Sequence, residues 1–264
     1  PFIERSSVGE TLQNIRKVLD IGSIYYPRGG WGEIFSRFSE KIKENGEIRL
    51  KSEVSEIVIK EGKAIGVKIG DEIINGEKII STIPVQQLFT ILDENLCDKD
   101  FIKKCKNLRP TAGVSIDFCL SKPISDINGG IMLENPLGFG FIPSNISPEV
   151  APEGKSLMTF FAITNVEDIK DKNKSNEIYQ HLRSAILKFF PEIENNLVFE
   201  RPLFHEMIDG VEVNTEQHRL KRPGNEIEGI SNLFITGDSV GGECAGGDVG
   251  HTSVRNCYKN IVGR

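Results

Sequence analysis

The 264-residue sequence lacks several patterns that mark whole classes of proteins. Lys and Arg number 32 against 38 Asp and Glu, so no excess of positive charge is available for a nucleic-acid surface. No apolar run is long enough to span a bilayer, and no stretch has the pattern of a signal peptide. The composition therefore predicts a globular chain, 38% hydrophobic, whose partners do not include nucleic acid.

Cysteine pairing motifs are also missing. The five cysteines show no C-x-x-C spacing and are odd in number: Cys97, Cys105, Cys119, Cys244 and Cys257. This pattern fits reduced thiols better than a disulfide framework or a zinc site. We therefore predict no metal site and a cytoplasmic location. Cys244 lies in a glycine-rich loop, but nothing beside it would lower its pKa, so we do not expect it to be redox-active.

The chain is organised around residues 232–262. A short apolar run, residues 233–236, predicts a buried strand that ends at Gly237 and Asp238. Ligands of open α/β sheets sit beyond the carboxyl ends of the strands, which is where Asp238 would lie. A glycine-rich loop follows. The next segment opens at Asp248 and has apolar residues at helical spacing: Val249, Val254, Cys257, Tyr258 and Ile261. The start of such a helix favours an anion or an electron-rich carbonyl.

Strand, Gly-Asp turn, glycine-rich loop and closing helix together resemble the FAD motif of the flavin amine oxidase and phytoene desaturase superfamily. The resemblance implies that Asp238 binds the ribityl chain of FAD. It also implies that backbone N–H groups at the start of the helix face the pyrimidine edge of the flavin ring. The cofactor-binding residues implied by this motif are Gly237, Asp238, Asp248, Val249, Gly250 and His251.

A second block near the start of the chain resembles the same superfamily. It comprises a P-x-G-G turn at residues 27–30, an amphipathic helix that ends near Gly46, and a set of β-hairpins that ends at Pro84. The resemblance implies that the backbone of Val54, carried on a strand, pairs with the adenine of FAD. The residues by themselves favour an ordinary strand valine at this position. Residues 7–21 predict a further amphipathic helix, whose apolar side is expected to pack.

The intervening residues resemble the substrate domain of the superfamily. We expect helices over 84–108 and 177–190, and strands over 111–120, 131–133, 139–142, 156–163 and 197–205. Residues 131–143 are apolar and broken by glycine; they either line a channel for an apolar substrate, with Phe139 and Phe141 binding it, or form a hairpin that fills the core. His181, His205 and His218 are expected to be structural or surface residues.

The predicted fold class is α/β (α+β). An incomplete FAD-binding Rossmann-like domain, residues 29–84 and 226–264, is joined to a substrate-binding domain of a mixed sheet and helices, residues 1–28 and 85–225. The superfamily opens with a G-x-G-x-x-G dinucleotide fingerprint, and none follows a strand in the first hundred residues. We therefore expect the C-terminal portion of a longer flavoprotein, which by itself binds FAD weakly or not at all and self-associates.

The function implied by the resemblance is that of an FAD-dependent oxidoreductase, a phytoene-desaturase-like dehydrogenase that transfers hydride from a substrate C–H bond to the flavin. The expected substrate is a small apolar organic molecule, and no catalytic side chain is identified. Two alternatives stay open: an amine or protoporphyrinogen oxidase, and a cofactor-free folded module without activity. The closing motif has no aromatic residue between Gly237 and Val254, which disfavours an amine. A homodimer and a peripheral membrane contact are further hypotheses.

Overall fold

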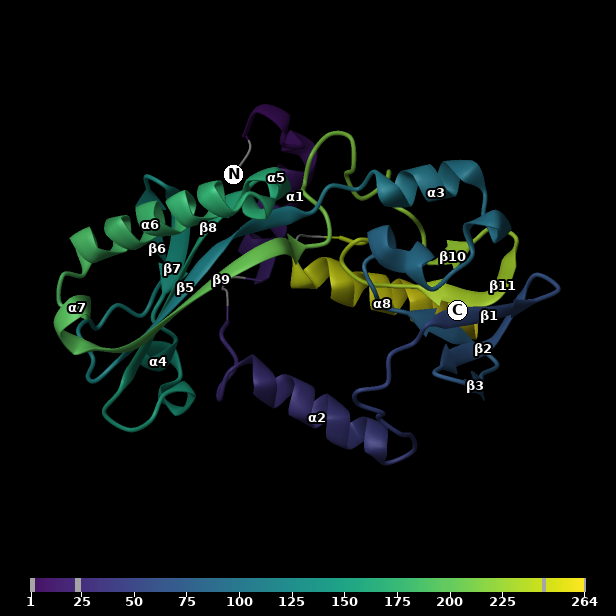
Figure 1. Cartoon of the computed structure of the whole chain (residues 1–264), viewed down its shortest axis with the longest axis horizontal. Helices are drawn as coiled ribbons and strands as arrows, with labels where there is room; N and C mark the ends of the chain where they lie inside the picture. Colours follow the sequence, from purple (N-terminus) through teal and green to yellow (C-terminus); the bar gives the residue numbers. More distant parts are fainter. Residues whose placement is uncertain (1–2, 22–24, 244–245, 264) are drawn as a thin grey trace. The chain divides into compact units, whose positions relative to one another are not determined.

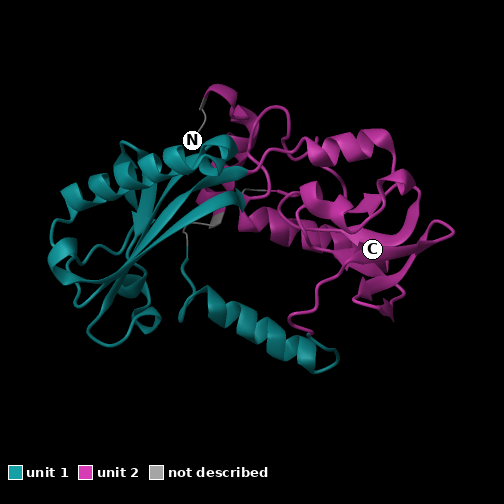
Figure 2. Ribbon diagram, in the orientation of Figure 1, with its two compact units in different colours: residues 1, 23–48, 111–208 teal, residues 2–22, 49–110, 209–264 magenta. Residues whose placement is uncertain are grey.

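The structure is a computed structural model that describes residues 3–21, 25–243 and 246–263. The chain divides into two compact units (Figure 2). Unit 1 consists of residues 1, 23–48 and 111–208, and unit 2 consists of residues 2–22, 49–110 and 209–264. Each unit has a β-sheet of its own, so a mixed α/β fold with two sheets is confirmed.

Unit 1 is built on a five-stranded sheet with the strand order β6-β7-β8-β5-β9 (Figure 1). Its strands are β5 (Thr111–Leu120), β6 (Ile131–Glu134), β7 (Leu137–Phe141), β8 (Ser156–Thr164) and β9 (Leu197–Asp209). The pairs β6–β7, β7–β8 and β5–β8 are antiparallel. β5 lies between β8 and β9, and its alternating apolar residues face the core, while Ser115 and Cys119 on the other face are half-buried.

The helix α6 (Lys172–Phe189) runs along one face of this sheet (Figure 1). Asp171 caps it by accepting hydrogen bonds from the N–H groups of Asn173 and Lys174, and Pro191 follows its last turn. The core lies between α6 and the sheet, where Leu182 and Ile186 pack against side chains such as Phe160. Phe189, in the last turn of α6, is 65% exposed because α6 turns it away from the sheet. The remaining helices of the unit are α2 (Trp31–Lys43), α4 (Pro143–Ile146), η4 (Pro148–Val150), α5 (Val166–Lys170) and α7 (Ile193–Asn196).

β7 alternates glycine and large residues, and each type faces a different side of the sheet. Gly140 is paired with Phe160 on the side of α6, and a Cβ atom on Gly140 would overlap the Phe160 ring. Phe139 and Phe141 lie on the other side, half-buried, where their rings contact each other at a centroid distance of 6.1 Å. The predicted β6–β7 hairpin is confirmed, and its turn contains a cis peptide bond before Pro136.

Unit 2 contains a six-stranded sheet with the main order β1-β2-β11-β10, in which β3 pairs with β2 and β4 pairs with β11. Its strands are β1 (Glu56–Lys60), β2 (Lys63–Ile69), β3 (Glu72–Asn75), β4 (Ile79–Ser81), β10 (Glu226–Ile227) and β11 (Ile230–Ile235). β11 is parallel to β4 and β2, whereas the hairpins β1–β2 and β2–β3 are antiparallel. The sheet therefore has a parallel centre and an antiparallel extension.

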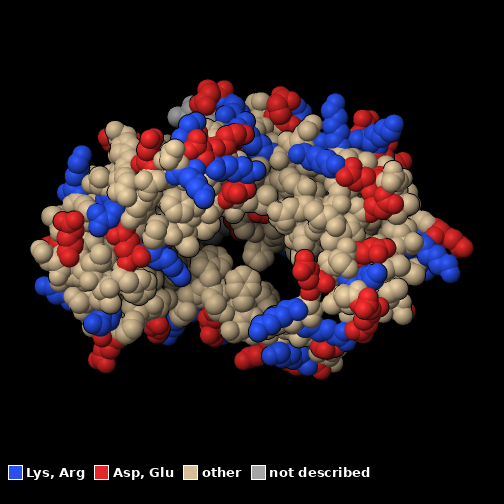
Figure 3. All heavy atoms as spheres, viewed as in Figure 1, with Lys and Arg blue, Asp and Glu red and all other residues tan. Residues whose placement is uncertain are grey.

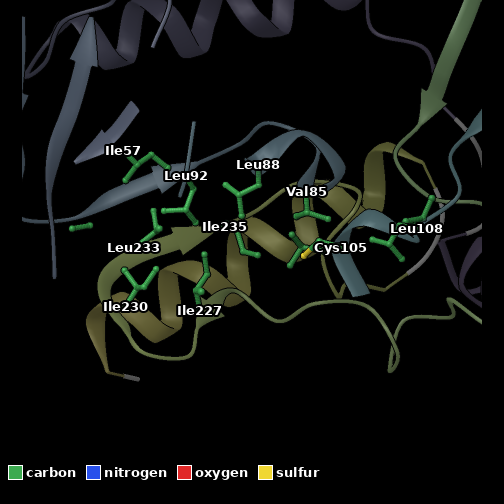
Figure 4. Close-up of a cluster of buried hydrophobic side chains, with 13 residues drawn as sticks. Ile57, Val85, Leu88, Leu92, Cys105, Leu108, Ile227, Ile230, Leu233 and Ile235 are labelled. Carbon is green, nitrogen blue, oxygen red and sulfur yellow. The ribbon is translucent and has the colours of Figure 1, made fainter. Parts of the chain in front are cut away.

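The core of unit 2 joins β1 and β11 to the segment 85–108 (Figure 4). In this cluster Leu233 lies beside Leu92, and Ile235 lies near Leu88. Because of this packing, the segment 85–110 belongs to the same unit as β11. The predicted substrate-binding domain had included this segment. Residues 2–22 and 209–225 also fall in unit 2, and 29–48 fall in unit 1. The assignment of FAD and substrate to the two predicted domains stays a prediction.

The helices of unit 2 are η1 (Ile3–Arg5), α1 (Val8–Ile21), η2 (Val85–Thr90), η3 (Glu94–Leu96), α3 (Lys99–Lys106) and α8 (Gly247–Val262). The predicted inward side of α1 is exposed, with Leu12 at 60% and Leu19 at 75%, because α1 is anchored through Glu10 instead. In α8, Val249, Ser253 and Cys257 are buried in one narrow strip. Val254 and Tyr258, which belong to the apolar residues at helical spacing, lie outside this strip and are exposed.

The strand that we expected to carry Val54 is shorter than predicted. β1 begins at Glu56, and Val54 is half-buried in the chain that precedes it. Glu56 is paired with Lys68 and β2 ends at Ile69, so β2 has no residue opposite Val54 with which a strand could pair. The assignment of Val54 to a strand is therefore wrong, although the Ser55 N–H still donates to the Lys68 carbonyl at 2.9 Å.

Candidate functional site

Asp238 lies at the carboxyl end of β11, as the sequence predicts. Gly237 precedes it with a φ of 137°, a backbone conformation open to glycine and strained for other residues. One carboxylate oxygen of Asp238, Oδ2, accepts a hydrogen bond from the Gly210 N–H at 2.8 Å. Among the described residues, no hydrogen bond is made to its second oxygen. The half-buried carboxylate is thus held from one side and keeps one acceptor for a ligand.

The first two turns of α8 pack directly against this strand end. Ser253, fully buried, holds the two together because its Oγ accepts a hydrogen bond from the Gly237 N–H at 3.3 Å and lies 2.9 Å from Thr236 Oγ1. Asn225 adds to this contact by donating to both the Ser253 carbonyl and the Ile235 carbonyl. The backbone N–H groups at the start of α8 are therefore fixed relative to Asp238.

Two glycines allow the backbone segments to approach Asp238 and α8 closely. A Cβ atom on Gly210 would lie 2.5 Å from Asp238 Oδ1 and 2.9 Å from the Ser239 Cβ. A Cβ on Gly242 would lie 2.6 Å from the Val249 carbonyl oxygen. Since real Cβ atoms do not tolerate such distances, glycine at these positions is required for the shape of the site.

The structure brings together only some of the residues predicted to bind the cofactor. Gly237, Asp238, Val249 and Gly250 form one cluster, in which the Gly250 Cα region faces the Asp238 backbone. Val249 is 1% exposed, and its N–H donates to the Gly246 carbonyl at 3.1 Å.

Asp248 and His251 stand on the exposed side of the same first turn, and Val54 lies on a separate segment before β1. The roles of all seven residues in cofactor binding stay predictions. Cys244 lies outside the described residues.

A buried ion pair adjoins this site. Arg222 and Glu10 have side chains 0% and 4% exposed, and the Arg222 Nη2 lies 3.3 Å from the Glu10 Oε1. Burial lowers the pKa of the Arg222 guanidinium, and the negative charges of Glu10 and Asp238 oppose this shift. The segment that carries Arg222 is tied to the Asp238 loop by a 2.8 Å hydrogen bond from the Gly241 N–H to the Pro223 carbonyl. A buried positive charge therefore lies near the site carboxylate.

In unit 1, the sheet face opposite α6 presents half-buried aromatic side chains. Phe139 is paired with Phe161 at a ring centroid distance of 5.6 Å, and Tyr26 packs on Phe141 at 5.8 Å. A cavity of about 180 Å³ opens here, lined by Met132, Leu137, Gly138, Phe139, Phe161 and Ile163. Phe139 and Phe141, which we predicted to bind an apolar substrate, therefore lie on this face, while Leu133 of the same hairpin fills the core.

Other kinds of site find little support in the described part of the chain. No group of three His, Cys, Asp or Glu side chains there could hold a metal ion. No helix among residues 3–21, 25–243 and 246–263 is long and apolar enough to cross a membrane. On the face shown in Figure 3, acidic and basic side chains are intermingled, with no extended field of one sign.

Sequence reasoning missed Gly210, Ser253 and Arg222, although each shapes the Asp238 site. Ser253 is four residues after Val249, so the helical period that marks the buried strip of α8 would have included it. Gly210 and Arg222 reach the site only through the fold, since they lie outside the closing motif and no local pattern connects them to Asp238.

Comparison with known proteins gives a consistent result. The profile of one family, flavin containing amine oxidoreductase, matches residues 8–251. A chloroplastic prolycopene isomerase of Daucus carota is 29% identical over 205 residues, which cover 68% of this chain.

The crystal structure of an oxidoreductase from Methanosarcina mazei superposes on 94% of this chain with a TM-score of 0.76 and 24% identity. A Pyrococcus furiosus protein superposes on 97% of it with a TM-score of 0.71 and 20% identity. This chain spans 33% of the length of the carrot relative, 59% of the Methanosarcina protein and 58% of the Pyrococcus protein.

Proposed function

Because the chain belongs to the family of flavin containing amine oxidoreductases, we propose that it serves the FAD-dependent oxidation of a small apolar organic substrate, in the manner of a phytoene-desaturase-like dehydrogenase. FAD, when bound, supplies the two-electron acceptor that takes a hydride from a substrate C–H bond. The residues of this chain bind and orient both molecules.

The observation that carries the flavin part of the proposal is the geometry around Asp238. Its carboxylate is anchored by the Gly210 N–H and keeps one oxygen that accepts a ribityl hydroxyl. The first turn of α8 lies beside it, and its N–H groups and dipole stabilise negative charge on the pyrimidine edge of the ring. The site residues therefore fit the polyol and pyrimidine parts of FAD.

The apolar face of unit 1 supports the substrate class. Phe139, Phe141 and Phe161 offer aromatic surface and a cavity of about 180 Å³, and burying apolar area of the substrate against them supplies the binding free energy. The carrot relative is named for a carotenoid-related substrate, prolycopene, which also favours an apolar molecule over an amine.

An FAD titration of the purified protein, followed by quenching of flavin fluorescence, tests the cofactor. In Asp238→Ala we expect a loss of about 1.5–3 kcal/mol of binding free energy, or roughly 10- to 150-fold in Kd, because a hydrogen bond to a charged acceptor is lost. The control is Asp71→Ala, which removes an exposed carboxylate from the β2–β3 turn of the same unit. Equal affinities for Asp238→Ala and the wild type would contradict the assignment. We expect the chain by itself to bind FAD weakly or not at all, so if the wild-type chain gives no titration the same pair of variants is compared in the full-length protein; a full-length protein that binds no FAD would support the cofactor-free alternative.

A further inference from the structure

We propose that Ser115 and His205 form the polar end of the apolar face of unit 1 and bind a hydroxyl or carbonyl group at one end of an otherwise apolar, rod-shaped substrate. This inference rests on the proposed function and deepens it, since it names the class of substrate. It concerns the sheet face opposite α6, on which Phe139 and Phe161 lie.

One row of side chains crosses this face from strand to strand. Met132 on β6 is paired with Phe139 on β7, Phe139 with Phe161 on β8, and Phe161 with Ser115 on β5. Paired residues of neighbouring strands point to the same side of a sheet, so these four side chains form a continuous row. The row continues onto β9, because a 3.1 Å hydrogen bond joins Ser115 Oγ to His205 Nε2.

The row changes from apolar to polar at one point. Neighbouring strands lie about 4.8 Å apart, so the four steps from Met132 to His205 cover roughly 19 Å. The first three residues offer only apolar surface, and the last two offer hydrogen-bonding groups. A ligand laid across the strands therefore meets the polar pair only at one end.

The hydrogen-bonding capacity of the pair is not used up within the protein. Ser115 and His205 are both half-buried, and His205 uses Nε2 for its bond to Ser115. Among the described residues, Nδ1 of His205 has no hydrogen-bond partner. An apolar ligand that covered this nitrogen would leave it without water or partner, which is unfavourable. An oxygen atom at that end of the ligand can form the hydrogen bond with Nδ1 that the displaced water had made.

The next row indicates that the end group is neutral. Asp117, on the same face two residues from Ser115, accepts hydrogen bonds from Thr159 Oγ1 at 2.8 Å and from Arg201 Nε at 3.0 Å. The carboxylate and the guanidinium thus neutralise each other. No unbalanced charge of this row remains to attract an ionised end group, whereas a serine hydroxyl and an imidazole bind a hydroxyl or carbonyl well.

Two fluorescent probes of the same shape test the inference: 1,6-diphenylhexatriene, which is apolar throughout, and its 4-hydroxymethyl derivative. Both are titrated into the full chain, which requires no flavin. We expect the wild type to bind the hydroxymethyl probe roughly 3- to 10-fold more tightly, the discrimination that one hydrogen bond provides. His205→Phe should remove this preference and bind the apolar probe at least as well.

Further variants separate recognition from folding. His205→Gln keeps a hydrogen-bonding side chain and should retain part of the preference, and Ser115→Ala should reduce it. His181→Phe, an exposed position on α6 on the other side of the sheet, is the matched control and should change nothing. An unchanged preference in His205→Phe would overturn the inference.

The failure of the inference differs from the failure of the proposed function. If Phe139→Ala weakens both probes but the wild type does not distinguish them, the apolar face binds substrate and the polar pair has no part in it. If neither probe binds the wild type, the apolar face is not a binding site, and both the inference and the substrate part of the proposed function are wrong. The flavin part is tested separately by the FAD titration of Asp238→Ala.

Discussion

Removing Arg222 should destabilise the protein far more than removing both members of its ion pair. In Arg222→Leu, the carboxylate of Glu10, 4% exposed, is left buried without its cation. An uncompensated buried charge of this kind costs about 3–5 kcal/mol. The Gln217 carbonyl, which accepts from Arg222 Nε at 2.9 Å, loses its partner as well.

The double variant Glu10→Leu and Arg222→Leu should recover most of this loss. The pair is incompletely satisfied, because Arg222 Nη1 and Glu10 Oε2 find no hydrogen-bond partner within the described part of the chain. Its attraction therefore offsets little more than the cost of burying two charges, and an apolar pair of similar volume performs about as well. The contrast between single and double variants is the quantity to be measured.

Urea unfolding followed by far-ultraviolet circular dichroism gives the free energies of all variants. Arg28→Leu is the control: the Arg28–Glu149 pair, 3.5 Å apart, has side chains 91% and 51% exposed and should contribute less than about 1 kcal/mol. If Arg222→Leu costs no more than Arg28→Leu, or if the double variant is as unstable as the single one, the reasoning about this pair is wrong.

Three further outcomes are expected. Gly210→Ala should cost about 1–3 kcal/mol in urea unfolding and weaken FAD binding, since its Cβ would meet the site carboxylate, whereas Gly224→Ala, with open space around it, should do neither. The hydrogen bond from Lys174 lowers the pKa of Asp168. The stability that this hydrogen bond adds is therefore present above pH 3.8, the ordinary pKa of an aspartate, and is lost as the pH falls through the lowered pKa of Asp168. Asp168→Asn should flatten the acid limb of a stability–pH curve. Burial raises the pKa of Cys105 to about 12, and mass spectrometry should find it unmodified by iodoacetamide at neutral pH until the protein unfolds.

Elements with a strong period were predictable from the sequence. β5 has the predicted bounds, Thr111 to Leu120, because ten alternating residues define both its ends and its faces. The order of β11 and α8 was also predictable, since a buried strand, a Gly-Asp turn, a glycine-rich loop and a helical period follow one another in the sequence. Asp238 consequently lies at the strand end where the sequence placed it.

Features set by distant residues were not predictable. Periodicity correctly placed a helix at α1, but its buried contact is Glu10 with Arg222, 212 positions away, and not its apolar side. Likewise, the Ser115–His205 pair joins residues 90 positions apart, and only the order of β5 and β9 in the sheet brings them together. His205 looked like an ordinary strand histidine because its partner is on another strand.

The alternation of glycine and phenylalanine in β7 separates the packing of the core from the shape of the apolar face, so that one can change without the other. Gly140 accommodates the core ring of Phe160, and Phe139 and Phe141 face the other side, without part in that packing. Replacements at the two phenylalanines therefore change the shape of the apolar face while the core keeps its contacts. Under the proposed function, a lineage of such proteins can change its hydrophobic substrate by replacing Phe139 or Phe141, provided that Gly140 between them is retained.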